Sequence, residues 1–297
     1  MNDLSQLLTE ARNPATENLD QLTTLDLVTS LHTADREAIA SVDPELPQIA
    51  AAIDGIVARL EQGGRLFYLG AGTSGRLGVL DASECPPTYN TPPEMVQGLI
   101  AGGDHALRHS VERAEDDETL GQHDLEARDF SSKDVLVGIA ASGRTPYVLG
   151  GIKYARELGA LSIGLSCVPD SLLARAADLA ITPATGPEPV TGSTRMKAGT
   201  ATKIVLNMLS TGAMIRLGYV FGNLMVNVQP TNVKLQDRAA RIIATVTGRG
   251  YDESNTLLRS AGSVKTAIVM AKLNVDRVTA EEKLAAAHGR LRTALDN

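Results

Sequence analysis

The chain has 297 residues, 43% of them hydrophobic but only 3% aromatic, with no tryptophan and a formal net charge of −7. This length suits one large α/β domain or a domain with an appendage. The acidic balance argues against nucleic acid as a partner, because nucleic-acid binding depends on neutralising phosphates. The two cysteines, Cys85 and Cys167, are too few for a disulfide framework. The first residues show no signal-peptide pattern and no apolar run approaches the ~20 residues that span a bilayer, so we expect a cytoplasmic protein without a membrane partner.

The first well-marked element is a helix that begins near residue 44. Asp43 is placed to cap it, and Pro44 suits its first position. Apolar residues at helical spacing form its inward stripe: Ile49, Ile53, Val57 and Leu60. The glycines at 63–64 end the helix, and we expect residues 1–50 to form an N-terminal helical segment.

Short apolar runs then alternate with helical stretches. We predict strands at 65–69, 96–100, 135–139, 161–165 and 179–181. Helices are expected between them, including 107–120 and 146–158. This alternation predicts right-handed crossovers and therefore an α/β fold with a parallel sheet.

A long helix is expected at 194–218, where small and apolar residues on one side favour packing in the core or at a subunit contact. After the glycines at 248 and 250 the pattern becomes helical and charged, which predicts helices at 255–260, 264–273 and 280–296. The expected domains are therefore an α/β domain at 51–235 and a small helical subdomain at 236–297.

Two glycine-and-hydroxyl loops follow predicted strands, at residues 70–75 (GAGTSG) and 142–146 (SGRTP). Glycine lets the backbone approach an anion closely, and the free N–H groups of the following helix point at it. Hydroxyl side chains add further donors. Because ligands of parallel sheets bind at the carboxyl ends of strands, the two loops predict a pocket for a small phosphorylated metabolite.

Each loop also has a simpler interpretation. The first matches the dinucleotide fingerprint, but the acidic residue expected about 20 positions later, at the end of the next strand, is missing. The central Thr73–Ser74 pair suits a phosphate monoester better than a pyrophosphate. A purely structural tight turn is the other alternative. In the second loop, Thr145 and Pro146 would by themselves cap and open a helix.

Two acidic regions are candidates for proton transfer. Glu84 precedes the prolines at 86–87, which we expect to end a helix and leave Glu84 on a constrained loop. The alternatives are a solvated loop glutamate and its neighbour Asp81. In the acidic stretch 109–121, most charges should form a solvated helix face. Glu115 and Glu118 both border the inward apolar stripe of that helix, and spacing does not choose between them.

Metal and thiol chemistry have little support. His105 and His109 are four residues apart, a spacing that can hold a metal, but no third ligand is evident and a solvated helix is the preferred interpretation. Cys85 has no visible partner that would activate it as a nucleophile. We therefore expect neither a metal nor another cofactor.

Four segments together resemble a known family. They are residues 69–78 (LGAGTSGRLG), 81–88 (DASECPPT), 140–147 (AASGRTPY) and 191–200 (TGSTRMKAGT). In this order they are similar to the bacterial N-acetylmuramic acid 6-phosphate etherases, over roughly residues 4 to 290. That family belongs to the sugar isomerase (SIS) domain class, so the resemblance implies a five-stranded parallel sheet sandwiched by helices.

The resemblance also implies an activity. Such an enzyme is a metal-free lyase that releases D-lactate and N-acetylglucosamine 6-phosphate by elimination and then hydration, during recycling of cell-wall sugars. Glu84 falls on the family's general acid and Glu115 on its general base, whereas Glu118 has no counterpart. The chemistry agrees, because eliminating an ether two carbons from an aldehyde needs one deprotonated and one protonated carboxyl group.

The same resemblance suggests the remaining contacts. Phosphate would be bound by side chains and backbone of the two loops, namely Thr73, Ser74, Ser142, Gly143 and Thr145. Ser193, in the last motif, would add a sugar or phosphate contact. A homodimer is expected by analogy with the class. The alternatives are a sugar-phosphate-sensing regulator similar to the glucokinase regulatory protein and an aldose–ketose isomerase. Glu84 favours the enzyme over a sensor, which has no use for it.

Overall fold

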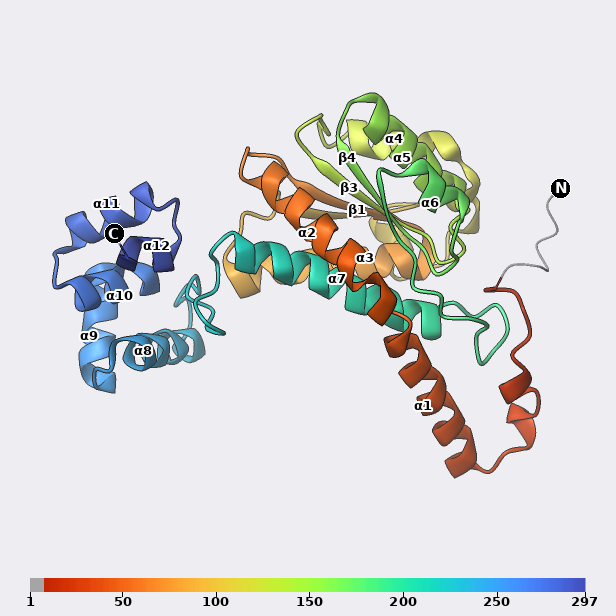
Figure 1. Cartoon of the computed structure of the whole chain (residues 1–297), viewed down its shortest axis with the longest axis horizontal. Helices are drawn as coiled ribbons and strands as arrows, with labels where there is room; N and C mark the ends of the chain where they lie inside the picture. Colours follow the sequence, from red (N-terminus) through yellow and green to blue (C-terminus); the bar gives the residue numbers. More distant parts are fainter. Residues whose placement is uncertain (1–7, 297) are drawn as a thin grey trace. The chain divides into compact units, whose positions relative to one another are not determined.

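The computed structural model in Figure 1 describes residues 8–296, with all their side chains except that of Glu112. The first residues of the chain, from which we predict the absence of a signal peptide, lie outside this range. The described chain forms two compact units. The sheet unit runs to Ser83 and resumes over Pro93–Ser210, and the helical unit comprises Glu84–Pro92 and the chain from Thr211 onward.

A five-stranded, all-parallel sheet is the centre of the sheet unit, with strand order β2-β1-β3-β4-β5. The strands are β1 (Leu66–Gly70), β2 (Val96–Ile100), β3 (Val135–Ile139), β4 (Leu161–Leu165) and β5 (Leu179–Ile181). The predicted strands and the predicted α/β class with a parallel sheet are therefore confirmed, with β1 shifted by one residue.

Helices cover both faces of this sheet (Figure 1). One face carries α2 (Leu46–Leu60), α3 (Gly72–Tyr89) and α7 (Lys197–Arg216), and the other carries α4 (Glu118–Glu126), α5 (Pro146–Glu157) and α6 (Leu172–Ala176). Small residues permit close packing: a Cβ on Gly151 of α5 would lie 2.1 Å from Leu69, and one on Gly78 of α3 would lie 2.9 Å from the Tyr68 Cβ. A core poor in aromatics is thus filled by bringing backbones together.

The described N-terminal part, from residue 8 onward, contains mostly helical elements. It contains the 3₁₀ turns η2 (Pro14–Thr16) and η3 (Leu19–Gln21), helix α1 (Thr24–Ala40), and the turn η4 (Asp43–Glu45), which leads into α2. Two details of α2 were predicted wrongly. Asp43 does not cap it, and its buried stripe is Ile49, Ala52, Ile56 and Leu60, with Ile53 and Val57 only half-buried. Both stripes contain Ile49 and Leu60, and the structure buries Ala52 and Ile56 between them.

The helix predicted at 107–120 is wrong. The chain instead forms η5 (Asp104–Leu107), η6 (Glu112–Asp116) and then α4. The Arg76 guanidinium accounts for part of this break, because it donates to the carbonyls of Ala106 and Leu107 at 2.8 and 3.0 Å and so occupies acceptors of a continuous helix. The Asp117 carboxylate accepts from the Thr119 N–H at 2.9 Å and starts α4 as a separate helix.

Helix α3 also departs from prediction, because it continues through Pro86 and Pro87 to Tyr89. Glu84 therefore lies within a helix and not on a loop. The last turn is held by tertiary contacts: the Tyr89 hydroxyl donates to Thr211 Oγ1 at 3.3 Å, and its carbonyl accepts from Asn227 Nδ2 at 2.7 Å. These bonds offset the backbone hydrogen bonds that two prolines cannot make.

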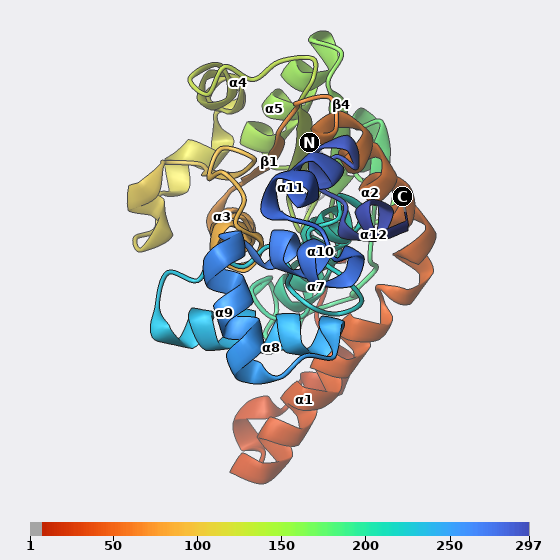
Figure 2. The ribbon, with the colours of Figure 1, turned by 90° about the vertical axis from the view of Figure 1, so that its left-hand side faces the viewer.

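The helical unit packs five helices around its own apolar core. They are α8 (Val233–Thr247), α9 (Tyr251–Ala261), α10 (Val264–Leu273), α11 (Arg277–Ala286) and α12 (Leu291–Asp296). Helix α10 contacts the other four and lies centrally among them (Figure 2). The predicted helix at 280–296 is wrong, because His288 and Gly289 adopt positive φ angles of 51° and 72° and separate α11 from α12. Over residues 8–296, no helix has both the length and the apolarity that a bilayer crossing needs.

An ion pair with a buried carboxylate joins the starts of β1 and β3. Asp134 is 1% exposed, and its carboxylate accepts from Arg65 Nη2 at 2.9 Å, from the Arg65 N–H at 2.8 Å and from the Ser131 N–H at 2.8 Å. Burial alone would raise the pKa of Asp134, but these hydrogen bonds outweigh burial and hold the pKa below its ordinary value.

We expect Asp134→Asn to lower the free energy of unfolding by about 2 kcal/mol near neutral pH, because an amide cannot accept all these bonds. A carboxyl group whose folded-state pKa is lowered stabilises the protein above its unfolded-state pKa of about 3.9. The difference from wild type should therefore shrink as pH falls through the folded-state pKa. Urea unfolding at several pH values measures this. Arg156→Gln, which removes a half-exposed ion pair with Asp178, is the control and should cost about 0.5 kcal/mol. An unchanging difference down to pH 3 would contradict this account.

Candidate active site

The two glycine-and-hydroxyl loops meet at one point of the sheet edge. β1 and β3 are neighbours, and Gly70 pairs with Ile139 at their carboxyl ends. The chain leaves β1 toward β2 on one side, whereas β3 lies on the other, so this is the switch point where parallel sheets bind ligands. The N-termini of α3 and α5 therefore both open at this edge, and their partial positive charges favour an anion there.

The first loop is a tight turn that only glycines allow. A Cβ on Gly70 would lie 2.7 Å from the Gly75 nitrogen, and one on Gly75 would lie 2.6 Å from the Gly70 oxygen. Gly72, with φ of +53°, opens helix α3. Thr73 and Ser74 follow in its first turn and are half-buried. Since their hydroxyls make no hydrogen bond to a described residue, these donors are left for a ligand.

The second loop is shaped by Gly143. Its φ is +66°, and a Cβ there would lie 2.2 Å from Ser171 Oγ. Thr145 occupies the N-cap position of α5 and Pro146 its first turn, as predicted, but the Thr145 side chain makes no capping hydrogen bond. Ser142 and Thr145 are both half-buried. The loop thus combines an exposed helix start with hydroxyls that the helix does not use.

The start of α7 adjoins the first loop. A Cβ on Gly199 would lie 3.7 Å from Thr73 Cγ2. Ser193, in the turn before α7, is half-buried. The Glu188 carboxylate accepts from the Lys197 and Ala198 N–H groups at 2.8 and 2.9 Å, and burial raises its pKa. This acidic cap, which the sequence analysis missed, neutralises the helix end, so α7 offers a ligand less positive charge than α3 or α5 does.

The two predicted catalytic glutamates fall in different units. Glu84 is exposed and belongs to the helical unit, and Glu115 is exposed and belongs to η6 of the sheet unit. Asp81, the competitor of Glu84, is 7% exposed and accepts from the Tyr68 hydroxyl at 2.9 Å and from Asn207 Nδ2 at 2.6 Å. Burial raises the pKa of Asp81 despite these bonds. Asp81 thus serves as an internal acceptor that ties α3 to β1 and α7.

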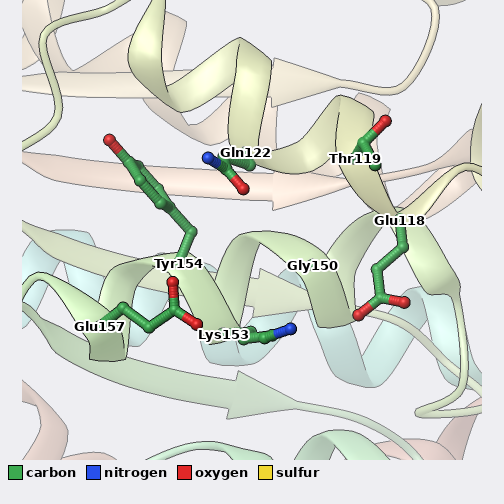
Figure 3. A pocket seen from close by; sticks show the side chains of 7 residues that line it. All are labelled: Glu118, Thr119, Gln122, Gly150, Lys153, Tyr154 and Glu157. Atoms are coloured by element: carbon green, nitrogen blue, oxygen red, sulfur yellow. The ribbon is translucent and has the colours of Figure 1, made fainter.

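Glu115 and Glu118, which spacing could not separate, have different surroundings. Glu118 begins α4 and lines a hollow of about 240 Å³ between α4 and α5. Figure 3 shows it there with Gln122 of α4 and with Lys153 and Glu157 of α5. Glu115 is not among the residues that line this hollow, and it follows Ala114, which is buried in the sheet-unit core.

The other reactive side chains are not arranged for catalysis. His105 and His109 stack with ring centroids 4.5 Å apart. Within residues 8–296, no group of three or more His, Cys, Asp or Glu side chains is placed to hold a metal ion. Cys85 is buried, and burial raises the pKa of the Cys167 thiol to about 12. Neither thiol is therefore set up as a nucleophile.

We expect Gly143→Ala to disrupt the second loop, because the new methyl group meets Ser171 and the residue keeps a positive φ. The cost should exceed the roughly 1–2 kcal/mol of a left-handed residue alone. Gly159→Ala is the matched control, since Gly159 has φ of +77° but nothing within 4 Å of a Cβ. Urea unfolding, and the stabilisation by added inorganic phosphate, measure both variants. If added phosphate stabilised Gly143→Ala but no longer stabilised Gly159→Ala, the second loop would not be the phosphate-binding loop.

Comparisons with known proteins extend this description. Two family models match: the glucokinase regulatory protein N-terminal SIS domain over residues 48–156, and the SIS domain over residues 118–212. Among solved structures, one described as a phosphosugar isomerase involved in capsule formation from Bacteroides fragilis has a TM-score of 0.53 at 20% identity, over 68% of this chain and 95% of the other. At that identity the likeness shows the fold alone.

Full-length relatives are much closer in sequence. N-acetylmuramic acid 6-phosphate etherase 2 of Vibrio parahaemolyticus is 53% identical over 99% of this chain and 99% of its own length. The N-acetylmuramic acid 6-phosphate etherase of Salmonella dublin is 53% identical over 99% of this chain and 100% of its own length. The chain therefore belongs to the N-acetylmuramic acid 6-phosphate etherase family.

Proposed function

We propose that this protein is an N-acetylmuramic acid 6-phosphate etherase, a carbon–oxygen lyase of cell-wall sugar recycling. It cleaves the lactyl ether of its substrate by elimination and then hydration, and it releases D-lactate and N-acetylglucosamine 6-phosphate. The observation that carries this proposal is the 53% identity to a named etherase along 99% of both chains. The switch-point loops add an anion site suited to the sugar phosphate.

The phosphate group would be held at the starts of α3 and α5. Four hydroxyl groups would donate to the phosphate oxygens, those of Thr73, Ser74, Ser142 and Thr145. Gly143 would let the backbone of the second loop lie close to the phosphate. One helix end contributes about 0.3–1 kcal/mol to binding an exposed anion and up to about 2 kcal/mol when partly buried. Two helix starts at one sheet edge, together with several hydroxyl donors, supply an affinity that neither loop offers alone. Ser193 would add a contact from the turn before α7.

The two glutamates would divide the proton transfers. Glu115, deprotonated, would remove the proton on the carbon beside the open-chain aldehyde. The electron pair then expels the lactyl oxygen from the next carbon, and Glu84, protonated, would give that oxygen its proton. Water then adds across the double bond of the resulting unsaturated aldehyde: its oxygen bonds to the same carbon while Glu84 accepts a proton from it, and the protonated Glu115 returns a proton to the carbon beside the aldehyde. Each transfer typically contributes about 10²–10⁴-fold to the rate.

We also propose that the enzyme works as a homodimer in the cytoplasm. Helix α1 extends away from the rest of the sheet unit (Figure 1) and exposes Leu25 and Val28, which are 73% and 50% exposed. Apolar side chains on a projecting helix favour packing against a second copy of the chain. The substrate itself, a metabolite of cell-wall recycling, supports the cytoplasmic location.

Incubation with N-acetylmuramic acid 6-phosphate should release D-lactate, which a coupled dehydrogenase assay measures. In water enriched in heavy oxygen, the label should enter the sugar hydroxyl that replaces the ether, because elimination breaks the bond between that carbon and the lactyl oxygen. Label in the lactate would refute this route. Tight binding of the substrate without lactate release would favour the sensing regulator instead.

Glutamine variants should separate the two roles. Glu84→Gln should lower lactate release by about 10²-fold or more while the proton beside the aldehyde still exchanges with deuterated water. Glu115→Gln should lose both reactions, because the exchange needs the base. Glu118→Gln, which alters the α4–α5 hollow, is the control and should resemble wild type. If Glu118→Gln lost exchange while Glu115→Gln retained it, the base would be assigned to the wrong residue.

A further inference from the structure

One arginine connects the phosphate-binding helix to the segment that carries Glu115. Arg76 comes directly after the first loop and lies one turn into α3, which begins at Gly72. Its Nη2 donates to the Ala106 carbonyl at 2.8 Å and its Nε to the Leu107 carbonyl at 3.0 Å, with the His109 carbonyl 3.4 Å from Nη2. A single guanidinium thus gathers backbone acceptors from one short stretch, 106–109.

These acceptors belong to a stretch with few regular backbone bonds. The segment leaves β2 through Gly102 and Gly103, whose φ angles are +86° and +66°, and forms only the 3₁₀ turns η5 and η6 before α4. Ala106 is 3% exposed, so its carbonyl needs a protein donor. Removing the Arg76 side chain would therefore leave a buried acceptor unsatisfied and release the 104–109 stretch.

The far end of the segment is held by packing. Val111 and Ala114 pack against the core that includes Tyr147 of α5, and a Cβ on Gly102 would lie 3.0 Å from Val111. Glu115 comes directly after Ala114. The segment before Glu115 is therefore held by the Arg76 hydrogen bonds at one end and by the Val111–Ala114 packing at the other, and the Arg76 bonds come from the phosphate-binding helix.

We propose that Arg76 is a positioning residue that fixes Glu115 relative to the anchored phosphate. The inference rests on the proposed function, in which Glu115 is the base and the first turn of α3 binds the phosphate. With the phosphate held at one end of the sugar, proton removal at the other end requires the base at a set distance. A misplacement of about 1 Å can cost about 10²-fold in rate. The planar guanidinium suits this task because its N–H groups point in fixed directions, unlike those of lysine.

The test uses the full-length protein with three variants: Arg76→Ala, Arg76→Lys and the control Arg108→Ala. Arg108 is exposed on the same segment, so its removal deletes a positive charge without deleting the bonds to Ala106 and Leu107. We expect Arg76→Ala to lower kcat and the deuterium exchange beside the aldehyde by about 10²-fold, with KM near the wild-type value. Added guanidinium chloride at low concentration should restore part of kcat in Arg76→Ala. In Arg76→Lys the same addition should restore a smaller part of kcat than it does in Arg76→Ala.

Amide hydrogen exchange gives a readout that does not depend on turnover. In Arg76→Ala, or in Arg76→Lys if the alanine variant does not fold, exchange should accelerate in residues 104–116 while residues 146–157 stay protected. Unchanged exchange at 104–116, or kcat equal to that of Arg108→Ala, would overturn the inference. A rise in KM at constant kcat would assign Arg76 to substrate binding instead, and would also overturn it. Absence of lactate release by wild type would refute the proposed function, while the exchange experiment would still decide what Arg76 holds.

Discussion

The architecture depends on one constraint, the parallel pairing of β1 with β3. Parallel strands present all their carboxyl ends at one edge, and β1 and β3 are each followed by a helix whose first N–H groups face that edge. Because β2 lies on one side of β1 and β3 on the other, the helices that follow β1 and β3 start next to each other at this edge. The positive ends of α3 and α5 therefore converge at this edge.

That convergence requires backbone to approach backbone, and glycine makes it possible at each step. Gly70 and Gly75 permit the turn after β1, and Gly143 permits the turn after β3 to pass beside Ser171. On the outer layer, a Cβ on Gly150 would lie 1.8 Å from the Glu118 carbonyl, so α4 packs directly on α5. A chain with few aromatic residues thus gains rigidity by close contact between main chains, and the loop hydroxyls are held ready for a ligand.

Charged side chains cap or hold in place the helix ends, strand ends and irregular backbone of the sheet unit. Glu188 caps α7 and offsets its positive end, which leaves α3 and α5 as the stronger anion sites. Asp134 with Arg65 fastens the amino ends of β1 and β3, opposite the ligand edge. Arg76 fastens the irregular stretch after β2 to α3. Each of these groups satisfies buried backbone atoms that regular secondary structure does not reach.

The sequence by itself determined the strands, the parallel class of the sheet, and the loops that connect β1 to α3 and β3 to α5. These features could be predicted because apolar runs and glycines determine the conformation of their own short segments. It also carried the motifs that place the chain in its family. Only the tertiary structure decided where helices stop or continue. Tyr89 holds α3 past two prolines through Thr211 and Asn227. Arg76 binds the carbonyls of Ala106 and Leu107, just before the acidic stretch, and prevents a continuous helix there. In both cases the deciding partner is distant in sequence, so local periodicity could not reveal it, and the positions of Glu84 and Glu115 were misread for that reason.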